Sequence, residues 1–225
     1  MSSFSLKDDT NTAAWEAAYL RFETPEEETA KFAKRLKKLG SDEWLHNAEI
    51  AELFCGRGNG LRALSQLGFR QIEGFDLSPR LLAQCPRGFK CVEADCRSLP
   101  LTDACKDVVI IQGGLHHLEK LPDDLDRALA EAARVLRAGG RIVIVEPWQT
   151  PFLSFVHRVC GATLARRLSP KLDALAVMIE HERATYEQWL AQPRLILTQI
   201  ERHFAHEYCS MSWGKLWFRG RKKVS

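Results

Sequence analysis

The 225-residue sequence predicts an α/β fold in which helices cover both faces of a parallel sheet. Short apolar runs alternate with helical patterns between residues 48 and 146. The runs are apolar almost throughout, as expected for strands that are buried on both faces. The first run leads directly into a glycine-rich turn, "CGRGNG". This order of strand, glycine turn and helix predicts a ligand site at the end of the first strand.

The first expected elements are helices within residues 13–39. Thr24 followed by Pro25 and three glutamates is typical of a helix start. Apolar residues then recur at helical spacing until Gly40, which we expect to end the helix. We therefore predict an N-terminal helical cap over residues 1–47.

The middle of the sequence supplies the sheet, in a core that we place at residues 48–149. The expected strands lie at 48–54, 71–76, 89–94, 107–112 and 141–146. The expected helices lie at 58–67, 79–84 and 123–137, the last ended by Gly139 and Gly140. Strands alternating with helices in this way form βαβ units.

The remaining sequence stays helical for too long to continue the alternation. We predict a helical lid inserted after the fifth strand, over residues 150–192. Residues 193–225 would then hold the last crossover helix and a terminal hairpin around Trp213 and Gly214. All four segments are expected to form one domain.

Composition limits the class of protein. The sequence is 45% hydrophobic and 27% charged with a net charge of +3, which gives no specific indication of a nucleic-acid partner. No apolar stretch reaches the about 20 residues that span a bilayer. The seven cysteines show no CxxC pair and no spacing for a metal site, and no secretory signal is visible. We therefore expect a cytoplasmic protein with reduced thiols and no bound metal.

The glycine turn alone does not decide which ligand binds there. Gly56, Gly58 and Gly60 would let a ligand lie directly against backbone amides at a helix N-terminus. A P-loop is excluded because no Lys-Ser or Lys-Thr follows the glycines. The spacing GxGxG also differs from the dinucleotide pattern GxGxxG, and a purely structural turn is an alternative.

Two acids follow the glycines at successive strand ends. Asp76 ends the second strand, where a carboxylate can accept hydrogen bonds from both ribose hydroxyls. Asp95 ends the third strand, where it or a neighbouring amide could meet an adenine edge. Each acid alone could also cap the next turn, as Asp76 could before Ser78. The ordered set favours one nucleoside ligand.

Five motifs together resemble class I S-adenosylmethionine-dependent methyltransferases, and most closely the group that includes the ubiquinone/menaquinone C-methyltransferases. They are "ELFCGRGNG", "GFDLSP", "EADCRSLPL", "DVVIIQGGLHHL" and "RVLRAGGRIVIVEPW". The resemblance implies a Rossmann-like sheet of seven mostly parallel strands with the last strand antiparallel, in agreement with the terminal hairpin. It also implies S-adenosylmethionine as the cofactor.

The resemblance further implies a role for each matched position. Those for the cofactor are Glu52, Gly56 and Gly58 at the methionine end, Asp76 at the ribose, Leu77 and Asp95 at the adenine with the backbone of Cys96, and Gln112 near the sulfonium. One position departs from the family pattern: Phe54 stands where a glycine is usual. A ring there would narrow the methionine pocket.

The residues expected near the methyl acceptor begin in "GGLHHLEKLP", where His116 and His117 follow the fourth strand. Either imidazole could remove a proton from an acceptor, and either could instead only brace the loop. The motifs used to methylate nucleic-acid bases are missing from the matching position, so we expect a small-molecule acceptor at O, C or N. Two alternatives remain: a catalytically inactive cofactor-binding or scaffold protein on the same fold, and an NAD-dependent oxidoreductase.

Overall fold

The computed structural model describes residues 17–223, without the side chains of residues 163–165. A seven-stranded sheet has the strand order β3-β2-β1-β4-β5-β7-β6, and only β7 runs against its two neighbours. The strands are β1 (Ile50–Leu53), β2 (Ile72–Asp76), β3 (Lys90–Glu93), β4 (Lys106–Gln112), β5 (Leu136–Pro147), β6 (Phe204–Ser212) and β7 (Lys215–Lys222). The predicted α/β fold and its antiparallel strand are confirmed.

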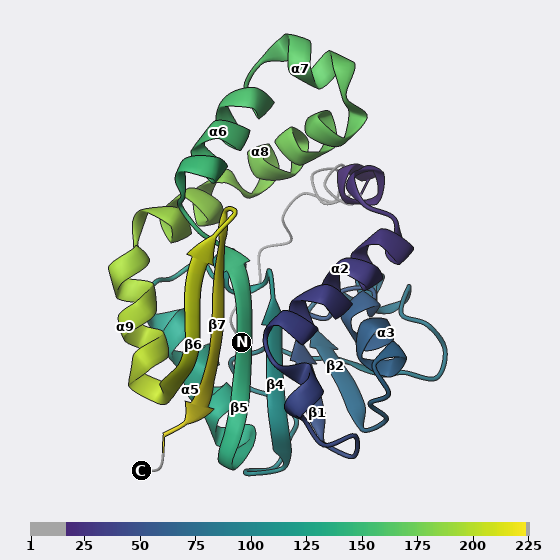
Figure 1. Cartoon of the computed structure of the whole chain (residues 1–225), viewed down its shortest axis with the longest axis vertical. Helices are drawn as coiled ribbons and strands as arrows, with labels where there is room; N and C mark the ends of the chain where they lie inside the picture. Colours follow the sequence, from purple (N-terminus) through teal and green to yellow (C-terminus); the bar gives the residue numbers. More distant parts are fainter. Residues whose placement is uncertain (1–16, 224–225) are drawn as a thin grey trace, which may run out of the picture.

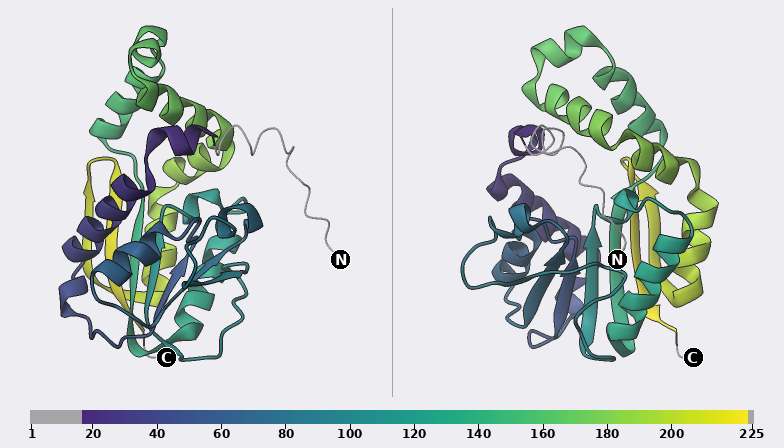
Figure 2. Two further views of the ribbon diagram at one scale, coloured as in Figure 1. Left: turned by 90° about the vertical axis from the view of Figure 1, so that its right-hand side faces the viewer. Right: turned by 180° about the vertical axis from the view of Figure 1, so that it is seen from behind.

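Helices cover both faces of the sheet (Figures 1 and 2), and each face carries a hydrophobic core. Successive side chains of a strand point to opposite faces, so neighbouring residues such as Ile110 and Ile111 enter different cores. One core is covered by α5 (Asp123–Val135) and α9 (Pro193–His203), and the other by α2 (Pro25–Lys38) and α3 (Asn59–Gln66). The apolar character of the central strands follows from this double burial.

The start of α2 is fixed as its sequence predicts. The hydroxyl of Thr24 accepts a hydrogen bond from the backbone N–H of Glu27, and the Glu27 carboxylate accepts one from the N–H of Thr24. This reciprocal pair is a capping box, and Pro25 occupies the first helical position. Residues 13–16 of the expected N-terminal helices lie outside the described residues.

Helix α5 is shorter than expected. It ends at Val135, and Leu136 already begins β5, whose first part includes Gly139 and Gly140. Gly139 has a φ of +74°, and a Cβ added at Gly140 would lie 2.9 Å from the carbonyl oxygen of Arg137. The two glycines therefore shape an irregular start of the strand instead of ending the helix.

The helices α6 (Pro151–Cys160), α7 (Thr163–Leu168) and α8 (Pro170–Ala191) extend beyond the carboxyl ends of the parallel strands (Figure 1). Trp189 of α8 is fully buried, and its indole N–H donates to the carbonyl oxygen of Pro147 at 2.9 Å. This contact fastens α8 to the end of β5. Within residues 17–223, no helix has the length and apolar content needed to cross a membrane.

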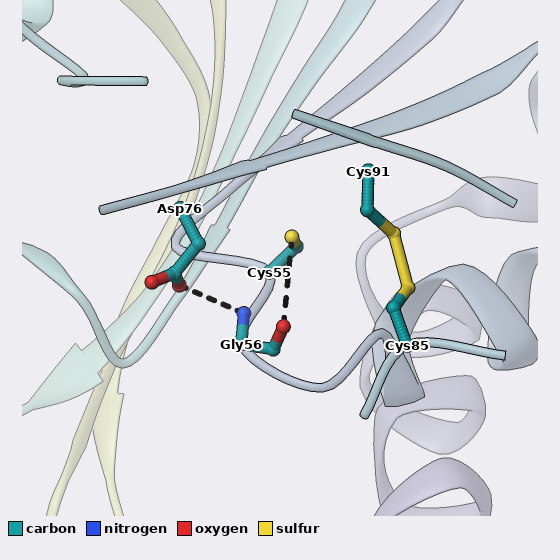
Figure 3. The surroundings of a disulfide bond; sticks show 5 residues. All are labelled: Cys55, Gly56, Asp76, Cys85 and Cys91. Carbon is teal, nitrogen blue, oxygen red and sulfur yellow. Dashed lines mark hydrogen bonds between the residues drawn. A yellow bond between two sulfur atoms is a disulfide. The ribbon is translucent and has the colours of Figure 1, made fainter. Parts of the chain in front are cut away.

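One pair of cysteines differs from the sequence expectation. Cys85 and Cys91 are joined by a disulfide bond (Figure 3), whereas the sequence predicts reduced thiols throughout. The chain turns back between the short helix α4 (Pro79–Leu82) and β3, which brings the two Cα atoms to 7.0 Å. The prediction is wrong for this pair, because spacing alone does not reveal that the turn brings both residues together.

Candidate active site

The site begins at the switch point of the sheet, where β1 and β4 are neighbours and their connections run in opposite directions. The chain leaves β1 through a tight turn in which Gly56 and Gly58 have φ values of +52° and +77°. These left-handed conformations carry little steric cost in glycine. The turn delivers the chain directly into α3, whose free N–H groups face the same end of the sheet.

Asp76 ties this turn to the end of β2 (Figure 3). One carboxylate oxygen accepts the N–H of Gly56 and the other accepts the N–H of Ser78, both at 2.8 Å. Burial raises the pKa of Asp76, and the backbone N–H groups oppose the shift. An ionised carboxylate has about four acceptor positions, so roughly two remain for a ligand diol.

A cavity of about 810 Å³ lies over this edge of the sheet. Its volume is within the range of ligand pockets. Seven of the ten predicted site residues line it: Gly56, Asp76, Leu77, Cys96, Gln112, His116 and His117. The same cavity also contacts α2, α6, α8 and the turn between β6 and β7. One continuous space therefore joins the predicted cofactor residues to the predicted acceptor residues.

Glu52 and Gly58 support the cavity without lining it. A Cβ added at Gly60 would lie 1.8 Å from Oε1 of Glu52, so the carboxyl group fills the space beneath the first turn of α3. Burial, followed by the charge of Glu28, raises the pKa of Glu52 to about 8. A Cβ added at Gly58 would lie 2.5 Å from Sγ of Cys85. Direct contact of either residue with a cofactor stays a prediction.

Asp95 also lies outside the cavity lining. Its carboxylate forms a bidentate pair with Arg97 at 2.9 and 2.7 Å, and Arg97 also pairs with Asp124. The Arg97 hydrogen bond lowers the pKa of Asp95 against the opposing effect of burial. Its neighbours Ala94 and Cys96 do reach the cavity. The sequence does not indicate that Arg97, two residues later, pairs with the Asp95 carboxylate.

Gln112 carries unused hydrogen-bonding capacity into the cavity. The residue is 8% exposed and its amide lies close enough to the Glu52 carboxyl group to lower the pKa of that group, but within the described chain neither amide atom has a partner at hydrogen-bond distance. Buried polar groups are rarely left unpaired in a complete site. The amide of Gln112 and the spare acceptors of Asp76 together fit the polar ends of a ligand such as S-adenosylmethionine.

Phe54 stands where a glycine was expected, and its backbone has the left-handed conformation that glycine usually adopts. Its φ is +57°, which is uncommon for a bulky residue and costs about 1–2 kcal/mol. The ring packs against Gly114, where an added Cβ would lie 2.1 Å from Cγ of Phe54. Phe54 therefore forms part of the cavity wall, with its ring seated over the turn that follows β4.

His116 is held by a buried carboxylate at the end of β5. Its Nδ1 lies 2.8 Å from Oε2 of Glu146, which is fully buried and also accepts the N–H groups of Gly114 and Leu115. Burial alone would lower the pKa of His116. The nearby carboxylates of Glu146 and Glu182 outweigh it and raise the pKa to about 9. Because Nδ1 is engaged, Nε2 is the atom that faces Glu182.

His117 is less constrained than His116. Its ring lies against that of His116, with centroids 4.1 Å apart, and Nδ1 is 3.6 Å from Oε1 of Glu182. Donor atoms of the three residues lie within 4.8 Å of one another, close enough to hold a cation as well as to exchange a proton. Tyr186 of α8 contacts His116 edge-on, so the lid forms one side of the cluster.

Two acids in this cluster were not predicted from the sequence. Glu146 stands at the end of the fifth predicted strand, in "VIVEPW", and a strand-end acid was the same signal that identified Asp76. Glu182 lies in the middle of α8, and its approach to the histidines depends on how the lid packs. Only the first of these residues could have been found from the sequence.

Comparison with known proteins agrees with this geometry. A family model described as "Methyltransferase domain" matches residues 51–144. A demethylmenaquinone methyltransferase of Thermobifida fusca is 29% identical over 65% of this chain and 70% of its own length. A ubiquinone/menaquinone biosynthesis C-methyltransferase of Acidiphilium cryptum is 49% identical over 44% of this chain. The chain spans only 36% of that second relative.

Solved structures give the same fold. An S-adenosylmethionine-dependent methyltransferase from Mesorhizobium loti superposes with a TM-score of 0.57 at 19% identity, covering 83% of this chain and 96% of its own. A methyltransferase from Methanosarcina mazei gives a TM-score of 0.58 at 15% identity, covering 82% and 97%. At these identities the likeness concerns the fold.

Proposed function

Since the chain belongs to the class I S-adenosylmethionine-dependent methyltransferases, we propose that it transfers the cofactor's methyl group to a small molecule bound beneath α6 and α8. The observation that carries the proposal is the single cavity that joins the nucleoside-binding edge of the sheet to the His116–Glu146 pair. Donor and acceptor would meet in that space, shielded from water by the lid.

On the donor side, the residues of the chain would bind the cofactor and orient its methyl group. The cofactor supplies a methyl group already activated by its positive sulfur, so positioning accounts for much of the rate. Asp76 would bind the ribose hydroxyls with its remaining acceptors, and Leu77 would pack on the adenine. The backbone at Gly56 and the amide of Gln112 would hold the methionine end. We assign Glu52 to support of the turn, through Gly60.

On the acceptor side, we assign proton removal to His116. Glu146 accepts the Nδ1 proton and thereby presents Nε2 to the cavity, as a general base requires. The raised pKa means that the imidazole is mostly protonated at neutral pH. For an acceptor that must lose a proton, the reaction should therefore accelerate as the pH rises toward about 9. His117, which is partly exposed, would support the ring of its neighbour.

The lining between the histidines and the lid is mainly apolar. It includes Phe152, Leu153, Val156, Leu175, Met178 and Ile179. Such a surface suits a small acceptor with an apolar body, which agrees with the quinone-related names of the two curated relatives.

Binding calorimetry tests the donor half directly. We expect S-adenosylmethionine and S-adenosylhomocysteine to bind and NAD to bind far more weakly. A preference for NAD would end the methyltransferase proposal. Incubating a cell extract with methyl-labelled cofactor and the protein should then label a small-molecule fraction, which identifies the acceptor.

A non-catalytic cofactor-binding protein is the second candidate, and Phe54 is the observation that favours it. The ring occupies part of the wall where the family usually has glycine, and its backbone is strained. Tight binding of S-adenosylhomocysteine, combined with no methyl transfer to any extract component, would support this candidate over the enzyme.

A further inference from the structure

The cavity has a charged end that the methyl-transfer site does not use. Helix α2 contributes Glu28, Lys31 and Arg35 to the lining, at spacings that place them on one helix face. Lys215, the first residue of β7, lines the cavity as well. Three cations from the two ends of the described chain therefore border one space.

The acids around this end already have partners. Glu23 pairs with Lys31, Glu28 with Arg57 and Asn59, and Glu146 with His116. The side chains of Arg35 and Lys215, in contrast, make no ion pair or hydrogen bond with any residue of 17–223. Arg35 is only 9% exposed and touches the ring of Phe32, with 5.2 Å between its guanidinium carbon and the ring centroid. The described part of the chain thus leaves two cations unpaired at the cavity wall.

The two α2 cations affect the ionisation of Lys215. Burial, followed by the charges of Arg35 and Lys31, lowers the pKa of Lys215 to about 7. Burial also lowers the pKa of Arg35, against the opposing charges of Glu23, Glu28 and Glu146, each of which is already paired with another residue. An unpaired buried charge is unfavourable. An anion bound to both side chains would offset the energetic cost of burying the two charges and would reduce the repulsion between them.

The position in the sheet separates Lys215 from the nucleoside. Lys215 pairs in register with Pro147 at the end of β5, next in sequence to Glu146. Asp76, the predicted ribose residue, is on β2, and the order β2-β1-β4-β5-β7 puts four strand spacings between the two. Strands lie about 4.8 Å apart, so the separation across the sheet is roughly 19 Å. Lys215 therefore lies toward the acceptor side of the cavity, and Arg35 lines the same cavity from α2.

We propose that Arg35 and Lys215 bind a carboxylate of the acceptor, so that the substrate class is an apolar small molecule with a carboxylate end. The guanidinium can form a bidentate pair with a carboxylate, and the lysine adds a second charge-assisted hydrogen bond. The apolar body would extend toward Phe152 and Met178, within reach of the transferred methyl group. This inference rests on the proposed function, because it assumes that the cavity holds an acceptor.

The test compares matched acids and esters on the protein saturated with S-adenosylhomocysteine. The probes are phenylpropanoate, 4-hydroxycinnamate and decanoate, each against its methyl ester, with affinity measured by calorimetry. We expect at least one acid to bind about tenfold or more tightly than its ester. Arg35→Gln and Lys215→Gln should each remove that preference, while Lys34→Gln, on the exposed face of α2, should retain it. Esters that bind as well as all three acids would overturn the proposal.

A second arm identifies which carboxylate the cations bind. S-adenosylhomocysteine carries a carboxylate, whereas 5′-methylthioadenosine lacks it. If Arg35→Gln weakens the first ligand about tenfold and leaves the second unchanged, the cations hold the cofactor and our assignment is wrong. If the unaltered protein binds neither nucleoside, the proposed function fails, and that result is distinct from a failure of the anion site. Circular dichroism and thermal unfolding of each variant show that it is folded.

Discussion

Replacing Glu146 with glutamine tests the central pair of the proposed active site. Glu146→Gln keeps the shape of the side chain, and its amide oxygen can still accept the N–H groups of Gly114 and Leu115. What it removes is the negative charge 2.8 Å from Nδ1 of His116. Among residues 17–223, the imidazolium then keeps Glu182, at 3.7 Å, as its one close counter-charge.

The size of the effect follows from the pKa of His116. It is raised from 6.5 to about 9, a difference of about 2.5 units, which corresponds to about 3 kcal/mol of preference for the charged ring. Burial opposes this preference and persists in the variant. We therefore expect the pKa of His116 to fall by roughly 2 units or more, to near or below its ordinary value.

The sign of the stability change can also be stated. A group whose folded pKa is raised stabilises the fold fully below its unfolded pKa, here 6.5, and the contribution is lost as the pH rises through about 9. The pKa of Glu146 is lowered against the effect of burial, mainly by its hydrogen bond to His116, so its contribution is lost as the pH falls below 4.5. The unaltered protein should thus exceed Glu146→Gln in stability most clearly between about pH 5 and 6.5.

The assay is an NMR titration of the histidine ring signals, with EDTA present so that no cation competes for the imidazoles. Chemical denaturation at several pH values follows the stability difference. Glu201→Gln, an exposed charge change on α9, is the control and should leave the His116 titration unchanged. A His116 pKa that stays within half a unit in Glu146→Gln would refute our account of the pair.

Four further substitutions test the donor side and the packing of the turns beside it. Asp76→Ala should weaken S-adenosylhomocysteine binding by about tenfold or more, measured by calorimetry, because the turn and the ligand diol lose the same acceptor. Gly60→Ala should lower the free energy of unfolding by about 1–3 kcal/mol in urea, since the new Cβ would lie 1.8 Å from Glu52. Gly114→Ala should lower the free energy of unfolding by a similar amount, and adding Phe54→Gly to that variant should restore about 1 kcal/mol or more, because the three atoms nearest to the new methyl group all belong to Phe54.

These substitutions share one control. Gly161→Ala adds the same methyl group at a glycine with helical backbone and only ordinary contacts at 3.5 Å, so both stability and binding should stay unchanged. An unchanged affinity in Asp76→Ala would remove it from the ribose site. Equal losses from Gly114→Ala with and without Phe54 would show that another contact blocks the methyl group.

Much of the sheet could be predicted because its signals are local. The central strand β4 contains four consecutive apolar residues, 108–111, and ends at Gln112, as the sequence indicates, and the capping residues of α2 lie close together in the chain. The strand-end rule also places Asp76 correctly at the cavity, because parallel strands end at one edge.

The remainder of the site depends on long-range packing. Asp95 has the same local signal as Asp76, yet Arg97 and the distant Asp124 hold it away from the cavity. Glu182 reaches the histidines only through the packing of α8, and Lys215 lines the same cavity as Arg35 only because β7 inserts next to β5. Neither arrangement leaves a spacing pattern in the sequence.

The position of β7 has a consequence for biosynthesis. This strand is the last one within residues 17–223, yet it lies inside the sheet, between β5 and β6, and brings Lys215 to the cavity. A ribosome-bound chain that has not yet released residue 222 therefore lacks one wall of the pocket, however well the first five strands have folded. Competence to bind an acceptor should arise abruptly, at the moment when this strand docks.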